Sequence, residues 1–135
     1  MRRQEQEVRE PVEEEEKTMS NSSINFSELL ERVENDRELL RDLLLIFKEE
    51  FPRLNQALHD AVESREAKRV TAEAHTLKGM LSHLAARQAA DAAARLEQLG
   101  RKEKTSEFTG ALAAFDQVAR QLLLQVDSCV AEVPR

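Results

Sequence analysis

Apolar residues recur every three or four positions along nearly all of the chain after residue 24, and this spacing constrains the fold more than any other feature. It is typical of amphipathic helices, and no segment shows the two-residue alternation of a half-buried strand. The longest stripe consists of Phe108, Leu112, Phe115, Val118 or Ala119, Leu122, Val126 and Val130. Because each stripe needs an apolar partner, we expect an all-α fold: an antiparallel four-helix bundle with an additional short N-terminal helix.

Capping residues predict where the first helices begin. Asn25 is followed three residues later by Glu28, and Asn35 is followed by Glu38 in the same way. Both pairs are similar to a capping box, in which the first side chain accepts a hydrogen bond from a free N–H group of the first helical turn. Pro52 then marks either a kink or the first turn of a further helix that runs to about residue 64.

Other residues predict the boundaries in the second half of the chain. Ser64 can cap a helix that begins near Glu66 and ends near Ala85. Gly100 predicts the C-terminal end of the next helix, and Thr105 can cap the last one. The helical region then covers residues 24–132 as one domain, which a chain of 135 residues is long enough to form.

Residues 1–23 differ from the rest of the chain. They contain an acidic run at positions 13–16, one proline and a polar stretch at positions 20–23, without apolar periodicity. This composition predicts a flexible tail or linker, and a binding role for the acidic run is a second interpretation.

Charge and apolar content exclude several classes of partner. The net charge of -6 and the isoelectric point of about 5.2 argue against nucleic acid and anionic lipid surfaces. The longest apolar run, at residues 43–47, is too short to span a bilayer, so we expect a cytoplasmic protein without membrane insertion. Cys129 lies in an apolar stripe and is expected to be a small buried hydrophobic residue.

One histidine is predicted to point away from the core. At about 100° per residue, His75 lies opposite an apolar stripe on its own helix, and Lys78 flanks it one turn away. Gly79 follows, although glycine inside a helix costs about 1 kcal/mol relative to alanine. The missing side chain would leave the imidazole open to another protein. The stripe opposite the histidine consists of Val70, Ala74, Leu77, Leu81 and Leu84.

The three residues together predict phosphoryl transfer. Neutral imidazole is a good nucleophile near neutral pH. A phosphoryl group on His75 would carry close to two negative charges, and Lys78 can offer it a mobile cation with three donors. We therefore expect His75 to carry phosphate.

The motif resembles that of histidine-containing phosphotransfer (HPt) domains of bacterial phosphorelays. The resemblance covers about residues 24–130 and extends to the leading helices, at residues 26–30, 36–40 and 47–50. Its most specific residues are Ala74-His75-Thr76-Leu77-Lys78-Gly79, then Leu84-Ala85-Ala86, and Leu96-Glu97 before Gly100.

The resemblance implies residue roles and partners. His75 would accept a phosphoryl group from a receiver-domain aspartate and pass it to a response-regulator aspartate, Lys78 would steady the group, and Gly79 would keep His75 accessible. The partners would be receiver domains and a sensor histidine kinase of the hybrid type. Mg²⁺ would be bound by the receiver, and this chain would be a monomer with no cofactor and no catalytic cycle of its own.

Two positions depart from the family pattern. Ala85 stands where the family usually has glycine, and we expect this change to alter packing more than chemistry. Some members place glutamine at position 97, whereas Glu97 would bring a negative charge that disfavours a nearby phosphate. The role of Glu97 is open at this stage.

The docking surface is expected around the acceptor and in parts of the first helix. Its candidate residues are Met80, Ser82, His83 and Ala86, and His83 either borders that surface or is simply solvated. His83 lies too far around the helix from His75 for the usual pair of metal ligands. We therefore expect no metal site, and we assign His59 no role.

Two other functions compete with phosphotransfer. The first is a helical adaptor that acts by binding alone, with the acceptor geometry spoiled by Ala85 or Glu97. The second is a carboxylate-bridged metal bundle, which needs inward-facing Glu-x-x-His pairs that the sequence lacks. No Gly-rich loop is present, so we do not expect phosphorylation directly from ATP.

Overall fold

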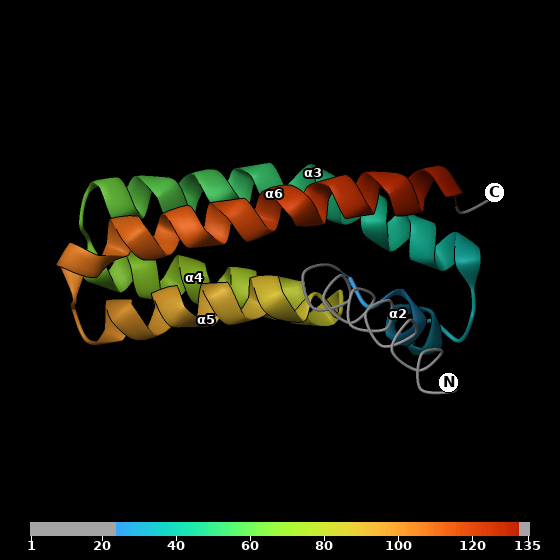
Figure 1. The fold of residues 1–135 in the computed structure, drawn as a ribbon, viewed down its shortest axis with the longest axis horizontal. Helices are drawn as coiled ribbons and strands as arrows, with labels where there is room; N and C mark the ends of the chain where they lie inside the picture. Colours follow the sequence, from blue (N-terminus) through green and yellow to red (C-terminus); the bar gives the residue numbers. More distant parts are fainter. Residues whose placement is uncertain (1–23, 133–135) are drawn as a thin grey trace, which may run out of the picture.

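Helices make up the whole of the regular structure in residues 24–132, the part of the chain that the computed structural model describes. The predicted tail at residues 1–23 lies outside this part. The all-α prediction is confirmed for the described residues (Figure 1). In chain order the elements are α2 (Phe26–Arg32), α3 (Arg37–Glu63), α4 (Ala67–His83), α5 (Arg87–Arg101), the single 3-10 turn η1 (Thr105–Glu107) and α6 (Phe108–Glu132).

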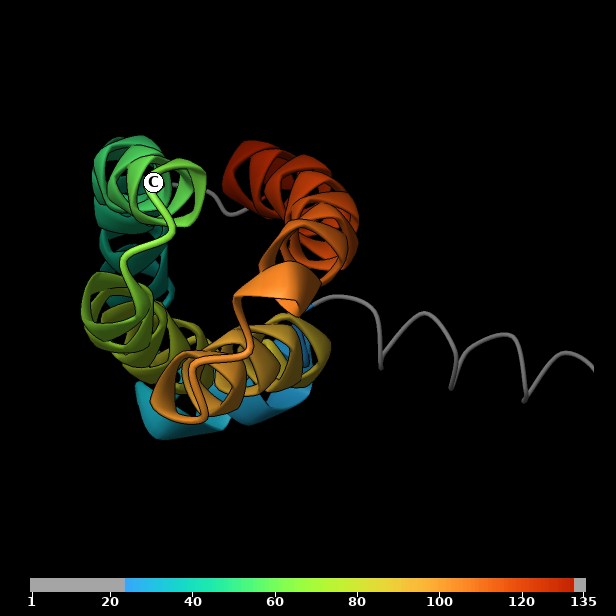
Figure 2. The same ribbon diagram turned by 90° about the vertical axis from the view of Figure 1, so that its left-hand side faces the viewer.

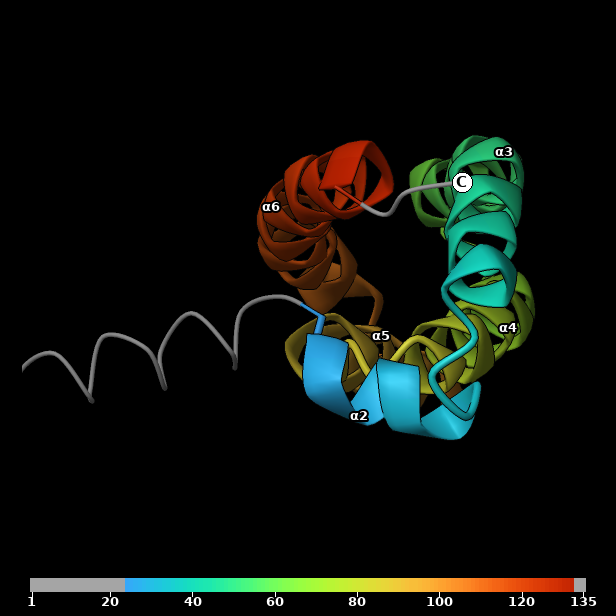
Figure 3. The same cartoon turned by 90° about the vertical axis from the view of Figure 1, so that its right-hand side faces the viewer.

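The long helices lie side by side, and consecutive ones run in opposite directions (Figure 1). Helix α3 packs on α4 and α6, and α5 packs on α4 and α6, so the four helices surround one interior (Figure 2). The short helix α2 lies across one end, next to α4 and α5 (Figure 3). None of the described helices is both long and apolar enough to cross a membrane.

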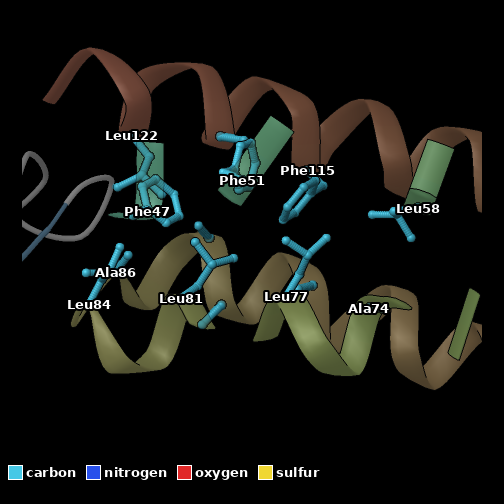
Figure 4. Close-up of a cluster of buried hydrophobic side chains, with 14 of the residues drawn as sticks. Phe47, Phe51, Leu58, Ala74, Leu77, Leu81, Leu84, Ala86, Phe115 and Leu122 are labelled. Carbon is cyan, nitrogen blue, oxygen red and sulfur yellow. The ribbon is translucent and has the colours of Figure 1, made fainter. Parts of the chain in front are cut away.

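The interior is filled by aromatic and aliphatic side chains from facing helices (Figure 4). The rings of Phe47 and Phe51 on α3 lie 5.1 Å apart, and Phe51 lies 6.4 Å from Phe115 on α6. Leu77 and Leu81 of α4 are fully buried against this cluster. Their burial fixes the rotation of α4 and turns the opposite face of that helix outward.

Helix α3 continues through Pro52, so the prediction of a new helix at that residue is wrong. Pro52 lies on the exposed side of the helix, where a carbonyl group that loses its N–H partner can bind water. Phe51 and Leu58 are buried on the opposite side. Apolar packing on that face favours one long helix despite the lost hydrogen bond.

The predicted cap at Asn25 is confirmed, whereas the second predicted cap is displaced by one residue. The Asn25 side chain accepts a hydrogen bond from the N–H of Glu28 at 3.0 Å. Helix α3 is capped by Asp36, whose side chain accepts from the N–H of Leu39 at 3.0 Å. Asn35 instead has a φ of 62°, a left-handed conformation that asparagine tolerates well.

Two further predicted caps are wrong. Ser64 is the C-cap residue of α3 and does not cap α4, which begins after Glu66 without a side-chain cap. Thr105 starts the 3-10 turn η1 and does not cap α6. Sequence spacing identified the turns correctly but not how they are closed.

The turns are closed by backbone hydrogen bonds around a left-handed residue. Arg65, Ala85 and Glu103 each follow a helix and have φ values of 57°, 57° and 54°. In the α4–α5 turn, the N–H of Ala86 donates to the carbonyl of Leu81 at 3.0 Å, the pattern of a Schellman motif. Glycine adopts this left-handed conformation without strain. The replacement of the family's usual glycine by Ala85 therefore affects the backbone conformation of this turn.

Gly100 lies inside α5, which continues to Arg101, so the prediction that the helix ends at Gly100 is wrong by one residue. The end of a helix is also not the main reason for a glycine at this position. A Cβ atom at this position would lie 2.4 Å from Oγ1 and 2.9 Å from the backbone nitrogen of Thr71 on α4. Gly100 therefore allows the two helices to approach closely. This contact brings the outward faces of α4 and α5 next to each other.

Candidate functional site

His75 lies in the middle of α4 on its outward face. Its neighbours Ala74 and Leu77 are fully buried, while 64% of the His75 side chain is exposed. This orientation is the one that the angular count predicted. An exposed imidazole on a rigid helix is accessible to a second protein.

A buried glutamate on α5 connects the residues of the motif. The side chain of Glu97 is only 4% exposed, and its Oε2 lies 2.9 Å from Nδ1 of His75. The other oxygen, Oε1, lies 2.7 Å from Nζ of Lys78. Arg101, one turn further along α5, donates to Oε2 at 2.8 Å. One carboxylate thus holds the histidine, the lysine and an arginine.

These contacts keep Glu97 ionised. The hydrogen bond from Lys78 is the largest effect and lowers the pKa of the Glu97 carboxyl. Burial acts in the opposite direction, but the bond from His75 and the positive charges of Lys78 and Arg101 lower the pKa further. The carboxyl group is therefore a carboxylate at neutral pH.

The ionised carboxylate determines which nitrogen of His75 carries the proton. A carboxylate can only accept hydrogen bonds, so Nδ1 of the neutral ring must be the N–H donor to Glu97. The lone pair then lies on Nε2, the ring atom that is not bonded to Glu97. This arrangement gives the imidazole a nucleophilic nitrogen in a fixed tautomer.

Gly79 leaves open space one turn from His75. A Cβ atom built at Gly79 would have no other atom within 4 Å, apart from the neighbouring helix backbone. Side chains at positions i and i+4 lie above each other on a helix, so this space adjoins the imidazole. Nothing within the described chain therefore requires glycine at this position.

The four predicted docking residues do not all lie on the surface. Ser82 and His83 are exposed, and Met80 is half-buried against the core. Ala86 is 1% exposed and lies among the core side chains, so its assignment to a docking surface is wrong (Figure 4). The angular count assumed a helix that continues to residue 86, whereas α4 ends at His83 and the chain turns inward.

Helix α2 contacts the end of α4 beyond the acceptor. Nη1 of Arg32 donates to the carbonyls of Ser82 and His83 at 2.8 and 3.0 Å. The backbone N–H of Asn25 donates to the carbonyl of Ala85 at 3.1 Å. A positive charge at the C-terminus of a helix is favourable, so α2 stabilises the helix that carries His75.

Two interactions were missing from the sequence predictions. The first is the ion pair of Arg101 with Glu97, although a spacing of four residues on one helix is a signal for such a pair. His59 pairs with Asp116 of α6 at 2.9 Å and lines a groove of about 290 Å³ between α3 and α6. Across residues 24–132, no cluster of three or more histidine, cysteine or acidic side chains could hold a metal ion.

The helical fold and the histidine motif together define a histidine phosphotransfer module. The family described as Hpt domain matches residues 42–133, about two-thirds of the chain, and this protein belongs to that family. The match includes the whole of α4 and α5 and confirms the resemblance stated above. Domains of this family take part in histidine phosphotransfer in phosphorelays, where they interact with response-regulator receivers and histidine kinases. No curated protein and no solved structure matches the chain significantly.

Proposed function

We propose that this protein is a phosphorelay intermediate that is phosphorylated reversibly on His75. It takes the phosphoryl group from the aspartate of one receiver domain and passes it to the aspartate of a response regulator. The observation that carries the proposal is the hydrogen bond of 2.9 Å between Nδ1 of exposed His75 and buried Glu97, which leaves Nε2 as the nucleophile.

The geometry supports a role for each motif residue. Nε2 of His75 attacks the phosphorus atom of the aspartyl phosphate, and the bond to the aspartate oxygen breaks. Lys78 is 36% exposed and has a flexible side chain, so its ammonium group can turn from Glu97 toward the phosphoryl oxygens. Gly79 leaves room for the receiver to approach Nε2.

The partners complete the chemistry. The receiver contributes the aspartate and binds the Mg²⁺ ion that neutralises the phosphoryl oxygens during transfer. A separate kinase uses ATP to supply the phosphoryl group at the start of the relay. This chain has no catalytic cycle of its own. In this proposal the four long helices act as an antiparallel four-helix bundle that holds α4 rigid, and the protein works as a cytoplasmic monomer.

The docking surface is proposed to surround His75 on α4. It includes the exposed residues Gly79, Ser82 and His83 and the half-buried Met80. Helix α2 borders this region through Arg32, which binds the last carbonyls of α4. A receiver that covers Nε2 of His75 must contact this part of α4.

A transfer assay with a matched histidine control tests the function. The full chain is incubated with a panel of phosphorylated receiver domains and Mg²⁺, and acid-labile phosphate on the chain is measured. We expect labelling of the wild-type protein and of His59→Ala, which removes a histidine of α3 outside the proposed docking surface, but none of His75→Ala. If folded wild-type protein is labelled by no receiver, the helical adaptor becomes the better function.

A further inference from the structure

Glu97 offers the His75 ring only hydrogen-bond acceptors. Its carboxylate lies 2.9 Å from Nδ1, is 4% exposed and accepts a hydrogen bond from Arg101 at 2.8 Å. Burial and the bond from Arg101 restrict its movement away from the ring, also when Lys78 turns toward the phosphoryl oxygens. The contact made by Nδ1 will therefore persist when Nε2 becomes phosphorylated.

We propose that Glu97 keeps the phosphorylated ring of His75 protonated at Nδ1 and so holds the phosphoryl group in its more transferable form. This inference rests on the proposed function, since it concerns the phosphorylated state of the same histidine. It makes Glu97 a positioning residue that acts on His75 and does not touch the phosphoryl group.

The bonds and charges balance without a proton transfer. During acceptance, the Nε2 lone pair forms the N–P bond and the aspartate carboxylate leaves with its electron pair. The ring now carries phosphorus on Nε2, a proton on Nδ1 and one positive charge. During donation, a receiver carboxylate attacks phosphorus, and the electron pair of the N–P bond returns to Nε2. Neutral imidazole is the leaving group, and the Nδ1 proton never moves.

Loss of the Nδ1 proton would slow donation for two reasons. The leaving group would then be an imidazolate anion, which is much less stable than neutral imidazole. The Nδ1 lone pair would also face a buried carboxylate at hydrogen-bond distance, which is unfavourable. The ionised form of Glu97 therefore favours the reactive form of the phosphorylated ring.

The surrounding charges agree with a protonated ring. Lys78 on α4 and Arg101 on α5 are the cations in contact with Glu97. A phosphoryl group carries close to two negative charges, and these two cations offset them. The protonated ring then offsets the charge of Glu97, so the cluster is close to neutral. Without the ring proton, one negative charge would stay unbalanced in a partly buried site.

Glutamine at position 97 separates the charge from the hydrogen bond. Its amide oxygen can accept from a protonated Nδ1, and its amide N–H₂ can donate to an unprotonated Nδ1. Glu97→Gln therefore supports both forms of the ring at almost the same side-chain volume. Glu73→Gln is a matched control, because Glu73 is a carboxylate of α4 about 200° around the helix from His75.

The first test examines the ring directly and needs no receiver. The wild-type chain is phosphorylated with phosphoramidate, a small phosphoryl donor, and the ¹⁵N signals of the phosphorylated histidine are recorded between about pH 6 and about pH 9. We expect Nδ1 to carry its proton at neutral pH in the wild type, and we expect the proton to leave at a pH about one unit lower in Glu97→Gln. An unprotonated Nδ1 in the wild type at neutral pH would overturn the inference.

The second test measures transfer from the phosphorylated chain to one receiver across the same pH range. We expect the rate for Glu97→Gln to fall off about one pH unit earlier, so that it is about tenfold slower at alkaline pH. The wild-type protein and Glu73→Gln should share one profile. Superimposable profiles for the wild type and Glu97→Gln would contradict the inference.

The two tests distinguish the failure of the inference from the failure of the proposed function. If no receiver accepts the phosphoryl group, phosphorelay function is contradicted, while the ¹⁵N measurement still decides the role of Glu97. If Glu97→Gln does not fold, the protonation state of the wild-type ring decides alone.

Discussion

Gly79 provides the sharpest test of whether the site is shaped for a partner. Gly79→Ala adds a methyl group that meets no atom within 4 Å, so it causes no clash within the described chain. The residue lies inside α4, which runs from Ala67 to His83. Stability alone therefore favours alanine at this position, because alanine is the better helix former.

The expected gain in stability follows from helix propensity. Replacing glycine by alanine inside a helix raises the free energy of unfolding by about 1 kcal/mol when the new methyl group fits. For a helical unit of this size, that gain raises the melting temperature by roughly 4–6 °C. The gain can be measured by urea denaturation followed by circular dichroism.

The same variant should slow phosphoryl transfer. The new methyl group lies one turn from His75 and occupies space through which a receiver must approach Nε2. A steric conflict at an otherwise close interface costs about 1–3 kcal/mol, which corresponds to a rate lower by about 5-fold to about 150-fold. Transfer from one phosphorylated receiver to the wild type and to Gly79→Ala measures this effect.

The other two glycines are matched controls. Gly110→Ala also meets no atom within 4 Å and should raise stability by a similar amount without changing transfer. Gly100→Ala would place its methyl group against the backbone of Thr71, and overpacking of about 1–3 kcal/mol should exceed the gain in propensity. A destabilised Gly79→Ala would refute the stability argument, and transfer at the wild-type rate would refute the access argument.

Three further predictions concern the turns, the buried carboxylate and α2. Arg65→Gly should raise the free energy of unfolding by about 1 kcal/mol in urea denaturation, because Arg65 is exposed and has a left-handed backbone conformation. Ala85→Gly should give a smaller increase, because this variant also loses a buried methyl group. The pKa of Glu97 is lowered from its ordinary value of 4.5, so its contribution to stability is present above that value and is lost as the pH falls through the folded-state value. Thermal unfolding should therefore show a larger loss of stability for the wild type than for Glu97→Gln between about pH 6 and about pH 3, and parallel curves would contradict this. Arg32→Ala should cost about 1 kcal/mol in urea denaturation, because it removes both hydrogen bonds to the end of α4; an unchanged midpoint would contradict that role.

Periodicity and motif spacing predicted much of the fold because both depend on local sequence. The apolar stripe of α4 predicted the outward direction of His75 without information on neighbouring helices. The apolar stripes of the other helices predicted an all-α fold. The errors lie where packing outweighs local preference. Pro52 did not end α3, because burial on the opposite face of the helix favours its continuation. Ala86 was predicted on the surface because the angular count treats the chain as a continuous helix, whereas α4 ends at His83.

The role of Glu97 depends on how closely two helices approach, and sequence spacing does not contain that information. Glu97 and His75 are separated by 22 positions, and their hydrogen bond forms only because α5 lies against α4. Gly100, three residues from Glu97, sets that approach by leaving no side chain between α5 and the backbone of Thr71. A glycine at the end of an apolar stripe was interpreted as a helix stop, the common reason for a glycine there. Its larger effect is on the chemistry of the site, since it lets a buried carboxylate reach Nδ1 of His75 and direct the reactive lone pair to Nε2.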